Sequence, residues 1–420
     1  MPVPGEQDAA ELRAAARSGL MALIGREDGP PLSPPPGLVR RMDAVARSVQ
    51  QWSDRAGAAV DVGWADLVTV RARLLGMRRR GRTSANETCR LLPATDGFVA
   101  VNLARPEDRA AVAAVVEGDP AADPWTALES ALATHTAAHV MARCRLLGVP
   151  AAPLGSPRAA APACAAHPMW APRAPRSLAE LRVVDLSSMW AGPLTAHLLA
   201  RAGARVVKVE SASRPDGLRA VPALYRTLHD DDQPLVTLDL TSSRGRDELR
   251  RLVTEADVVI ESSRPRALEQ LGIAPADLDG PPGKIWIGIT GYGRSDERRE
   301  WVAFGDDAAV AGGLVAWEAE GAPVFCGDAL ADPVTGMIAA AAAFEALAGG
   351  GGVLLDVALE GCAASLAPDT PALSHPASPH ADGWAVEVEG QTIPVRDRAA
   401  EAQASNTTRP ATTVARTGGG

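Results

Sequence analysis

The fold is decided by Leu181 to Glu210, which reads LRVVDLSSMWAGPLTAHLLARAGARVVKVE. The apolar run 181–186 has the length and β-branched content of a buried strand, and it ends at two serines, whose hydroxyls favour a turn or a helix cap. Apolar residues then recur every three or four positions as far as Gly203, which predicts a helix, and 206–210 reads as a second strand. A strand, a helix and a strand in this order predict a βαβ unit, which requires a parallel sheet.

The same alternation of strand and helix continues downstream. Strands are predicted over 235–240, 258–261 and 285–289, with helices over 244–254 and 266–271 between them. We therefore expect an α/β protein: a Rossmann-like doubly wound parallel sheet, with a smaller α+β domain placed N-terminally. In such sheets, ligands bind beyond the carboxyl ends of the strands. The first turn lacks G-x-G-x-x-G, since Gly192 is its only glycine, so a dinucleotide site is not supported.

Composition argues against several classes of partner. The 420 residues carry a net charge of −9, whereas nucleic-acid-binding proteins usually carry a strongly basic face. No uninterrupted apolar run reaches the length of a membrane span and no basic leader opens the chain, so we expect no membrane partner and a cytoplasmic location. The five cysteines lack C-x-x-C spacing, which predicts free thiols. His135 and His139 are one helical turn apart, but Thr136 replaces the glutamate of H-E-x-x-H, and we expect no metal site.

Five segments are expected along the chain. A helical segment 1–80 contains helices over 42–60 and 64–77, and a small α+β domain 81–154 combines a hairpin (90–92 and 98–103) with helices over 106–116 and 125–147. A Pro/Ala-rich linker spans 155–176 and the sheet domain spans 177–366. The tail 367–420 holds one hairpin-like piece, 384–395, and ends in a stretch predicted to be disordered.

A degenerate repeat is visible near the N-terminus. Residues 17–41, RSGLMALIGREDGPPLSPPPGLVRR, follow the same order of features as 311–336, AGGLVAWEAEGAPVFCGDALADPVTG. Both have Gly-Leu, a short apolar stretch, a charged turn, a proline and a helix start. The first copy has proline where the second offers Asp332, so it would carry no carboxylate for chemistry. A proline-rich loop between two helices explains the first copy equally well.

An ordered set of motifs resembles one enzyme family. The segments DLSSMWAGP, GARVVKVE, LVTLDL, ADVVIES, ITGYG, FGDDAAVAGGL and ADPVTGM resemble the class III coenzyme A transferases, which include formyl-CoA transferase, the carnitine CoA-transferases and α-methylacyl-CoA racemase. The likeness is good over 177–361 and weaker over 71–153. It implies an enzyme that moves coenzyme A between an acyl-CoA and a carboxylic acid through an aspartyl-CoA thioester, with no permanently bound cofactor. It also implies an interlocked homodimer.

The resemblance assigns roles to particular residues. Asp332 opens an Ala-rich helix in a D-x-x-x-G segment and is assigned as the nucleophile, although a helix N-cap is the alternative role for such an aspartate. Asp307 is assigned as its catalytic neighbour, and Gly312, Gly313 and Gly336 are expected to present N–H donors to an oxyanion. The residues predicted to bind CoA or substrate lie in the loops after the strands, and they are Ser188, Trp190, Ala191, Arg214, Arg219, Arg264, Tyr292, Gly312 and Gly313.

Three departures from the family keep alternatives open. The small domain precedes the sheet domain here, whereas it follows it in the family, so the order is permuted or duplicated. The racemases use Gly-His-Asp where this chain has Gly305-Asp306-Asp307, which weakens a racemase or isomerase activity. The acidic loop 229–234 replaces a basic cluster, so either Arg214, Arg219, Arg264 and the arginine-rich run 78–82 replace it, or the chain is a non-catalytic paralogue that acts as an interaction subunit.

Overall fold

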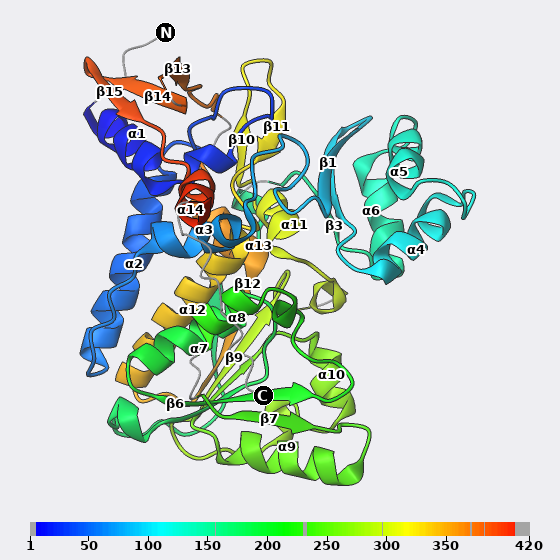
Figure 1. Cartoon of the computed structure of the whole chain (residues 1–420). Helices are drawn as coiled ribbons and strands as arrows, with labels where there is room; N and C mark the ends of the chain where they lie inside the picture. The colour runs from blue at the N-terminus through cyan, green and yellow to red at the C-terminus, as the bar shows by residue number, and fades with distance from the viewer. Residues whose placement is uncertain are drawn as a thin grey trace, which may run out of the picture.

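A seven-stranded sheet organises the part of the molecule that is drawn in the lower half of Figure 1. The computed structural model describes residues 6–155, 157–229, 233–295, 297–369, 372–381 and 383–407. Six strands are parallel, and β4 alone runs antiparallel, against β12. The strands, in spatial order, are β4 (Cys164–Pro168), β12 (Val353–Ala358), β9 (Ile285–Thr290), β8 (Val258–Glu261), β5 (Arg182–Asp185), β6 (Arg205–Ser211) and β7 (Leu235–Leu238). The predicted α/β class is confirmed.

Helices cover both faces of this sheet because successive strand residues point to opposite sides. Val183 and Ile260 face a core built with α7 (Ala191–Arg201), α12 (Ala331–Ala348) and α2 (Leu38–Arg55). Val184 and Val259 face α9 (Ser243–Glu255) and α10 (Pro265–Gln270) on the other side. The predicted helices 244–254 and 266–271 match α9 and α10 to within one residue at each end. The shorter helical pieces are η3 (Leu178–Glu180), η4 (Gly217–Ala220), α8 (Pro222–Leu228), η5 (Pro275–Asp277) and η6 (Glu297–Glu300).

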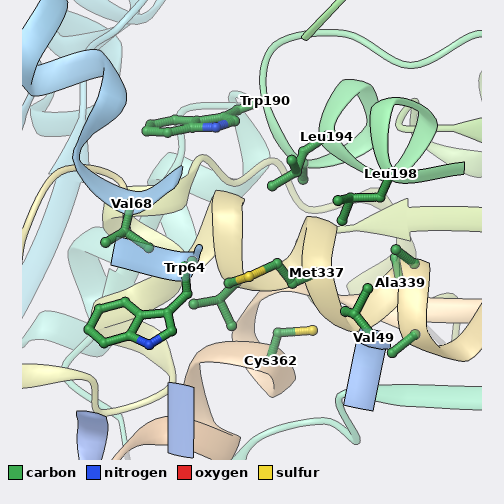
Figure 2. Close-up of a cluster of buried hydrophobic side chains, with 14 of the residues drawn as sticks. Val49, Trp64, Val68, Trp190, Leu194, Leu198, Met337, Ala339 and Cys362 are labelled. Atoms are coloured by element: carbon green, nitrogen blue, oxygen red, sulfur yellow. The ribbon is translucent and has the colours of Figure 1, made fainter. Parts of the chain in front are cut away.

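The N-terminal helices belong to the main core. The segment contributes α1 (Glu6–Ser18), η1 (Met21–Leu23), α2 and α3 (Trp64–Leu75), and α2 and α3 pack against α12. Val49, Trp64 and Val68 contact the same cluster as Leu194 of α7 and Met337 of α12 (Figure 2). α13 (Leu359–Leu366) closes this cluster. α12 is long and apolar enough to cross a membrane by length and composition (18 residues, mean hydropathy 1.2), but 61% of it is buried inside the protein, as in a core helix.

The small α+β domain has a core of its own. The predicted hairpin is present as β1 (Cys89–Ala94) and β2 (Gly97–Asn102), and β3 (Ala151–Pro153) adds a third antiparallel strand. Its helices are α4 (Pro106–Val116), α5 (Pro124–Leu132) and α6 (Ala137–Leu146). The single helix predicted over 125–147 is therefore wrong. Thr136 breaks it, because its hydroxyl accepts the His139 N–H at 3.1 Å and so starts a new helix.

The predicted linker and tail contain regular structure. The linker 155–176 contains η2 (Pro157–Ala159) and β4, whose backbone pairs with β12 at the sheet edge, so the linker prediction is wrong there. In chain order, α11 (Gly305–Ala311), β10 (Val315–Trp317) and β11 (Pro323–Phe325) come after β9 and before α12. The tail forms a three-stranded sheet and one helix: β13 (Ser378–His380), β14 (Gly383–Val388), β15 (Gln391–Pro394) and α14 (Arg398–Thr407). The stretch predicted to be disordered is 405–420: its first three residues belong to α14, which contradicts the prediction there, and from 408 onward it lies outside the described residues.

A close helix crossing explains Gly336, and its replacement is a first prediction. A Cβ on Gly336 would lie 2.7 Å from the backbone oxygen of Ala191, where α12 crosses α7. We expect Gly336→Ala to lower the free energy of unfolding by about 1–3 kcal/mol through overpacking, measured by urea unfolding. The matched control is Gly349→Ala at the end of α12, where the nearest atom to an added Cβ is 3.5 Å away. Equal stability of the two variants would contradict the close crossing.

Candidate active site

Two helix starts meet at the centre of the candidate site. α11 begins at Gly305 and carries Asp306 and Asp307, while α12 carries Asp332 as its second residue. The Gly305 N–H donates to the Asp332 carboxylate, and a Cβ on Gly305 would lie 2.6 Å from Asp332 Oδ2. Leu330 occupies the N-cap position and makes no side-chain cap, so the alternative role of Asp332 as the N-cap is wrong.

An arginine from the N-terminal segment enters this site. Arg71 of α3 donates from Nε to Asp328 Oδ2 at 2.7 Å and from Nη2 to Asp328 Oδ1, which is a bidentate pair. Asp328 is fully buried, and the guanidinium carbon of Arg71 lies 5.1 Å from the centre of the Trp190 ring. Burial lowers the pKa of Arg71, but the charge of Asp328 more than offsets it and the net pKa is raised. A permanent cation is therefore held among the carboxylates.

The small domain contacts the two aspartates of α11. Asn86 Nδ2 donates to Asp306 Oδ2 at 3.1 Å, and the Ala329 N–H donates to Oδ1 of the same residue at 2.9 Å. Asn102 Nδ2 donates to Asp307 Oδ1 at 3.1 Å, and the Phe304 N–H donates to that oxygen at 3.0 Å. Asp307 thus closes the first turn of α11 and ties it to β2.

Exposure separates Asp332 from the other three aspartates. Asp306, Asp307 and Asp328 are 2%, 0% and 0% exposed, whereas Asp332 is only partly buried. Burial raises the pKa of Asp332 to about 7 and that of Asp307 to about 8, while burial and then the charge of Asp328 raise the pKa of Asp306 to about 6. At neutral pH a substantial fraction of Asp332 is ionised and poorly solvated, while the residue keeps some solvent exposure, which suits a carboxylate nucleophile.

Two of the predicted arginines converge at the carboxyl edge of the sheet. Arg264 follows β8 and Arg214 follows β6. Burial, then the charges of Arg266, Arg105 and Arg214, lower the pKa of Arg264, so these cations share one region. Within the described part of the chain, neither Arg214 nor Arg264 forms an ion pair with a carboxylate. They are suited to an anionic ligand.

Three of the other predicted basic groups, Arg219, Arg79 and Arg80, are committed to the fold. Arg219 Nε donates to Glu210 Oε2 at 2.9 Å, so Arg219 is not a free ligand for phosphate. In the run 78–82, Arg79 donates to the backbone oxygens of Arg26 and Gly29, and Arg80 pairs with Glu27 and Glu87. Arg78 and Arg82 are exposed, so the phosphate role of this run stays a prediction that rests on these two residues. Of the acidic loop 229–234, residues 230–232 lie outside the described part of the chain.

The remaining predicted residues differ in what they can contact. Ser188 is exposed, and its N–H donates to Ser262 Oγ at 3.0 Å, in the loops after β5 and β8. Trp190 and Ala191 are buried, with Trp190 acting as a support for Arg71. Tyr292 is 2% exposed and packs against Ala152 and Ala311 between the small domain and α11, so it does not face a ligand.

The glycine donors predicted for an oxyanion are wrong. The N–H groups of Gly312 and Gly313 donate to the backbone oxygens of Ala308 and Val310, both at 3.0 Å. Gly336 lies inside α12, where its lack of a side chain admits α7. Gly312 is also a contact glycine, since its Cβ would lie 2.6 Å from the Glu360 backbone oxygen.

Comparison with known proteins identifies one family. Residues 178–385 match the sequence profile of CoA-transferase family III. The chain is 32% identical over 190 residues to succinyl-CoA–D-citramalate CoA-transferase of Chloroflexus aurantiacus (42% of this chain, 46% of that one). It is 33% identical over 147 residues to (R)-2-hydroxy-4-methylpentanoate CoA-transferase of Clostridioides difficile (32% and 37%). A CAIB/BAIF family protein from Brucella suis of solved structure is 29% identical, with 46% of this chain and 55% of that chain covered and a TM-score of 0.40. The chain thus spans less than half the length of these two curated relatives.

Proposed function

Residues 178–385 place this chain in CoA-transferase family III, and from that premise we propose that it transfers coenzyme A between an acyl-CoA and a carboxylic acid. The observation that carries the proposal is the partial exposure of Asp332 among four aspartates, three of which are buried and bound. The relatives named above are CoA-transferases that act on acids of different kinds, which supports CoA transfer as the reaction class.

The proposed reaction passes through two acyl transfers on Asp332. The ionised carboxylate attacks the donor thioester, which forms a mixed anhydride and releases the CoA thiolate. The thiolate then attacks the aspartyl carbonyl, so that CoA is bound to Asp332 as a thioester and the donor acid leaves. The acceptor carboxylate attacks this thioester, which gives a second mixed anhydride, and the thiolate attacks the acceptor carbonyl to regenerate Asp332. The reaction needs no redox partner and no permanently bound cofactor.

CoA is proposed to bind at the carboxyl edge of the sheet. In chain order the parallel strands are β5, β6, β7, β8, β9 and β12, and the order reverses between β5 and β8. Doubly wound, Rossmann-like sheets bind ligands at such a switch point. Ser188 follows β5 and Arg264 follows β8, so both lie beside that point, and Arg214 follows the adjacent β6. The arginines would contact the phosphates of CoA, with its sulfur directed towards Asp332.

Removal of one cation should weaken CoA binding. We expect Arg264→Gln to raise the dissociation constant of CoA about tenfold, since one charge-assisted phosphate contact contributes about 1.5 kcal/mol. Isothermal titration calorimetry measures this. Arg47→Gln, which changes an exposed arginine on α2, is the matched control and should bind like the native protein. Equal affinity of the two variants would contradict the placement of the phosphates at Arg264.

Two alternative functions remain distinguishable. A racemase or isomerase activity would need a base beside Asp306 or Asp307, and the polar side chains that hydrogen-bond these aspartates in the described structure are Asn86 and Asn102. A non-catalytic interaction subunit is favoured by the acidic loop that replaces the basic cluster. The absence of any heat on titration with millimolar CoA would favour the interaction subunit and count against the transferase.

The predicted homodimer is implied by the resemblance to the family, and also by the need of the small domain for a partner surface that covers its apolar faces. In the structure, part of that need is met within the chain, because Leu91 and Ala100 of the small domain pack against Val310 and Phe325 of the C-terminal half. The partner surface that a second subunit would offer is therefore supplied, at least here, by the chain itself.

A further inference from the structure

The degenerate repeat extends far beyond 17–41. SGLMA at 18–22 corresponds to GGLVA at 312–316, VDV at 60–62 to LDV at 355–357, and DGFVAV at 96–101 to DGWAVE at 382–387. The helices follow the same correspondence. α2 and α12 are both 18 residues long, and each is followed by the VDV or LDV segment and then by α3 or α13. We name residues 6–102 the first copy and 305–394 the second copy.

The hairpins of the two copies pair in the same register. In the first copy Pro93 lies opposite Phe98, and in the second copy Pro379 lies opposite Trp384. The third strand also matches, although the segment that connects it to the second strand differs between the copies. Val99 pairs with Pro153 after α4–α6, whereas Ala385 pairs with Pro394 after a short turn. The correspondence therefore holds in structure as well as in sequence.

The two copies exchange contacts reciprocally. One small core joins Ala16 and Met21 of the first copy to Ala377 and Val386 of the second. A second small core joins the counterparts of these four residues. Val310 and Val315 of the second copy correspond to Ala16 and Met21, 294 positions earlier in the chain. Leu91 and Ala100 of the first copy correspond to Ala377 and Val386, 286 positions later. Thus α1 of the first copy packs on β14 of the second, and α11 of the second copy packs on β2 of the first. In Figure 1, α1 and β14 lie at the upper left, and α11 lies nearer the middle, beside the small domain.

The centre of the arrangement obeys the same reciprocity. α2 packs against its counterpart α12, α3 packs against α12, and α13 packs against α2. Two backbone hydrogen bonds also join the copies, although they are not counterparts of each other: the Ser33 N–H of the first copy donates to the His375 oxygen of the second at 2.7 Å, and the Phe325 N–H of the second donates to the Gly81 oxygen of the first at 3.0 Å. In a two-fold, isologous interface, every contact between two residues is repeated between the counterparts of those residues in the other copy.

We propose that this chain is an internal dimer, in which two copies of one unit pair reciprocally within a single polypeptide and build one acidic centre from both copies. The second copy supplies Asp306, Asp328 and Asp332, and the first supplies Arg71 and Asn86. The counterpart centre lacks the carboxylates of Asp332 and Asp328, since alignment of the helix starts places Val39 opposite Asp332, and alignment of the Gly-Leu pairs places Pro34 opposite Asp328. The Val39 N–H there donates to Glu11 Oε1 at 3.0 Å. The sequence-based expectation of a proline opposite Asp332 is thus corrected, although its consequence is unchanged.

The internal dimer makes a second chain unnecessary for this interface. The surfaces through which each copy would pair with a second chain are already covered by the other copy of the same chain. That part of the proposal is independent of the proposed function. The assignment of one reactive centre per chain rests on the proposed function.

A disulfide across the two copies tests the proposal. Ile24 of the first copy forms an isolated antiparallel bridge with Cys326 of the second, so their Cα atoms lie within the range that a disulfide spans. Ile24→Cys is expressed in an oxidising cytosol, so that the bond forms as the chain folds. We expect peptide mapping to find the introduced thiol joined to Cys326. We also expect a band at the mass of one chain, 43.5 kDa, on a non-reducing gel, and sedimentation as a monomer.

Any outcome of this experiment other than a disulfide within one chain contradicts the internal dimer. A covalent dimer, lost in the matched control Ile24→Cys/Cys326→Ser, would show that the first copy of one chain pairs with the second copy of another. A folded Ile24→Cys variant in which the introduced thiol is not joined to Cys326 would show that the copies do not pair as described. The native protein should also sediment as one chain at micromolar concentration, and a stable native dimer would contradict the single-chain unit. None of these results depends on CoA binding, so a failed internal dimer and a failed transferase are told apart.

Discussion

Asp332→Asn is expected to abolish CoA transfer while the fold remains at least as stable as in the native protein. The side chain that would carry CoA is lost, and removal of an essential nucleophile leaves only residual turnover, lower by several orders of magnitude. The stability follows from the pKa of Asp332, which is about 7 in the folded state against an ordinary value of 3.8. The folded state therefore binds the extra proton, and its stability falls as pH rises from about 4 through 7. Because asparagine does not ionise, the melting temperature of the Asp332→Asn variant at pH 8 should not be lower than that of the native protein.

The matched control is Asp307→Asn. Asp307 is fully buried and accepts from Asn102 and the Phe304 N–H, so its replacement should perturb the α11 start without removing the acyl carrier. The transfer rates of the two variants are compared by steady-state kinetics, and their melting temperatures by differential scanning calorimetry. If Asp332→Asn turns over normally, Asp332 is only a residue of the first helical turn.

Arg71→Met is expected to cause the largest loss of stability among single changes at the site, about 3–5 kcal/mol. It leaves the Asp328 carboxylate buried without its bidentate partner. It also removes the cation that lowers the pKa of Asp332, which is about 7. We expect the pH midpoint of transfer to follow this pKa and to move upward in the variant. Urea unfolding measures the first effect, and a pH–rate profile measures the second, which a purely structural role would not change.

Two comparisons make the Arg71 result specific. Arg73→Met changes an exposed arginine on the same helix and should alter neither quantity. Arg71→Met/Asp328→Leu removes both charges and should recover much of the lost stability, since a buried pair is costly chiefly when only one partner remains. An Arg71→Met variant as stable as Arg73→Met, or with an unchanged pH midpoint, would contradict the role of Arg71 in holding Asp328 and Asp332.

Local pattern was sufficient for most of the sheet. β8 and α4 have the predicted bounds, because a short apolar run and a helix with Pro at its first position carry their signals within a few residues. β4 could not be found this way. Its five residues are polar or small and mostly exposed, and its strand conformation comes from backbone pairing with β12, almost 190 residues later in the chain.

The candidate site was predictable only in part. Asp332 was found because a recognisable segment surrounds it. Arg71, Asn86 and Asn102 were missed as site residues because their partners are 257, 220 and 205 residues away in sequence, and no local spacing records such a contact. The glycine predictions failed for another reason: glycine marks a close backbone approach as readily as a free N–H donor, and at Gly312 and Gly336 the close approach is what the structure contains.

The measurement that tests the transferase assignment most directly is mass spectrometry of the native protein after incubation with a panel of acyl-CoAs. The account predicts a hydroxylamine-sensitive CoA adduct, at most one per chain, on the peptide that contains Asp332. Transfer of CoA without any adduct, or with the adduct on another residue, would contradict it.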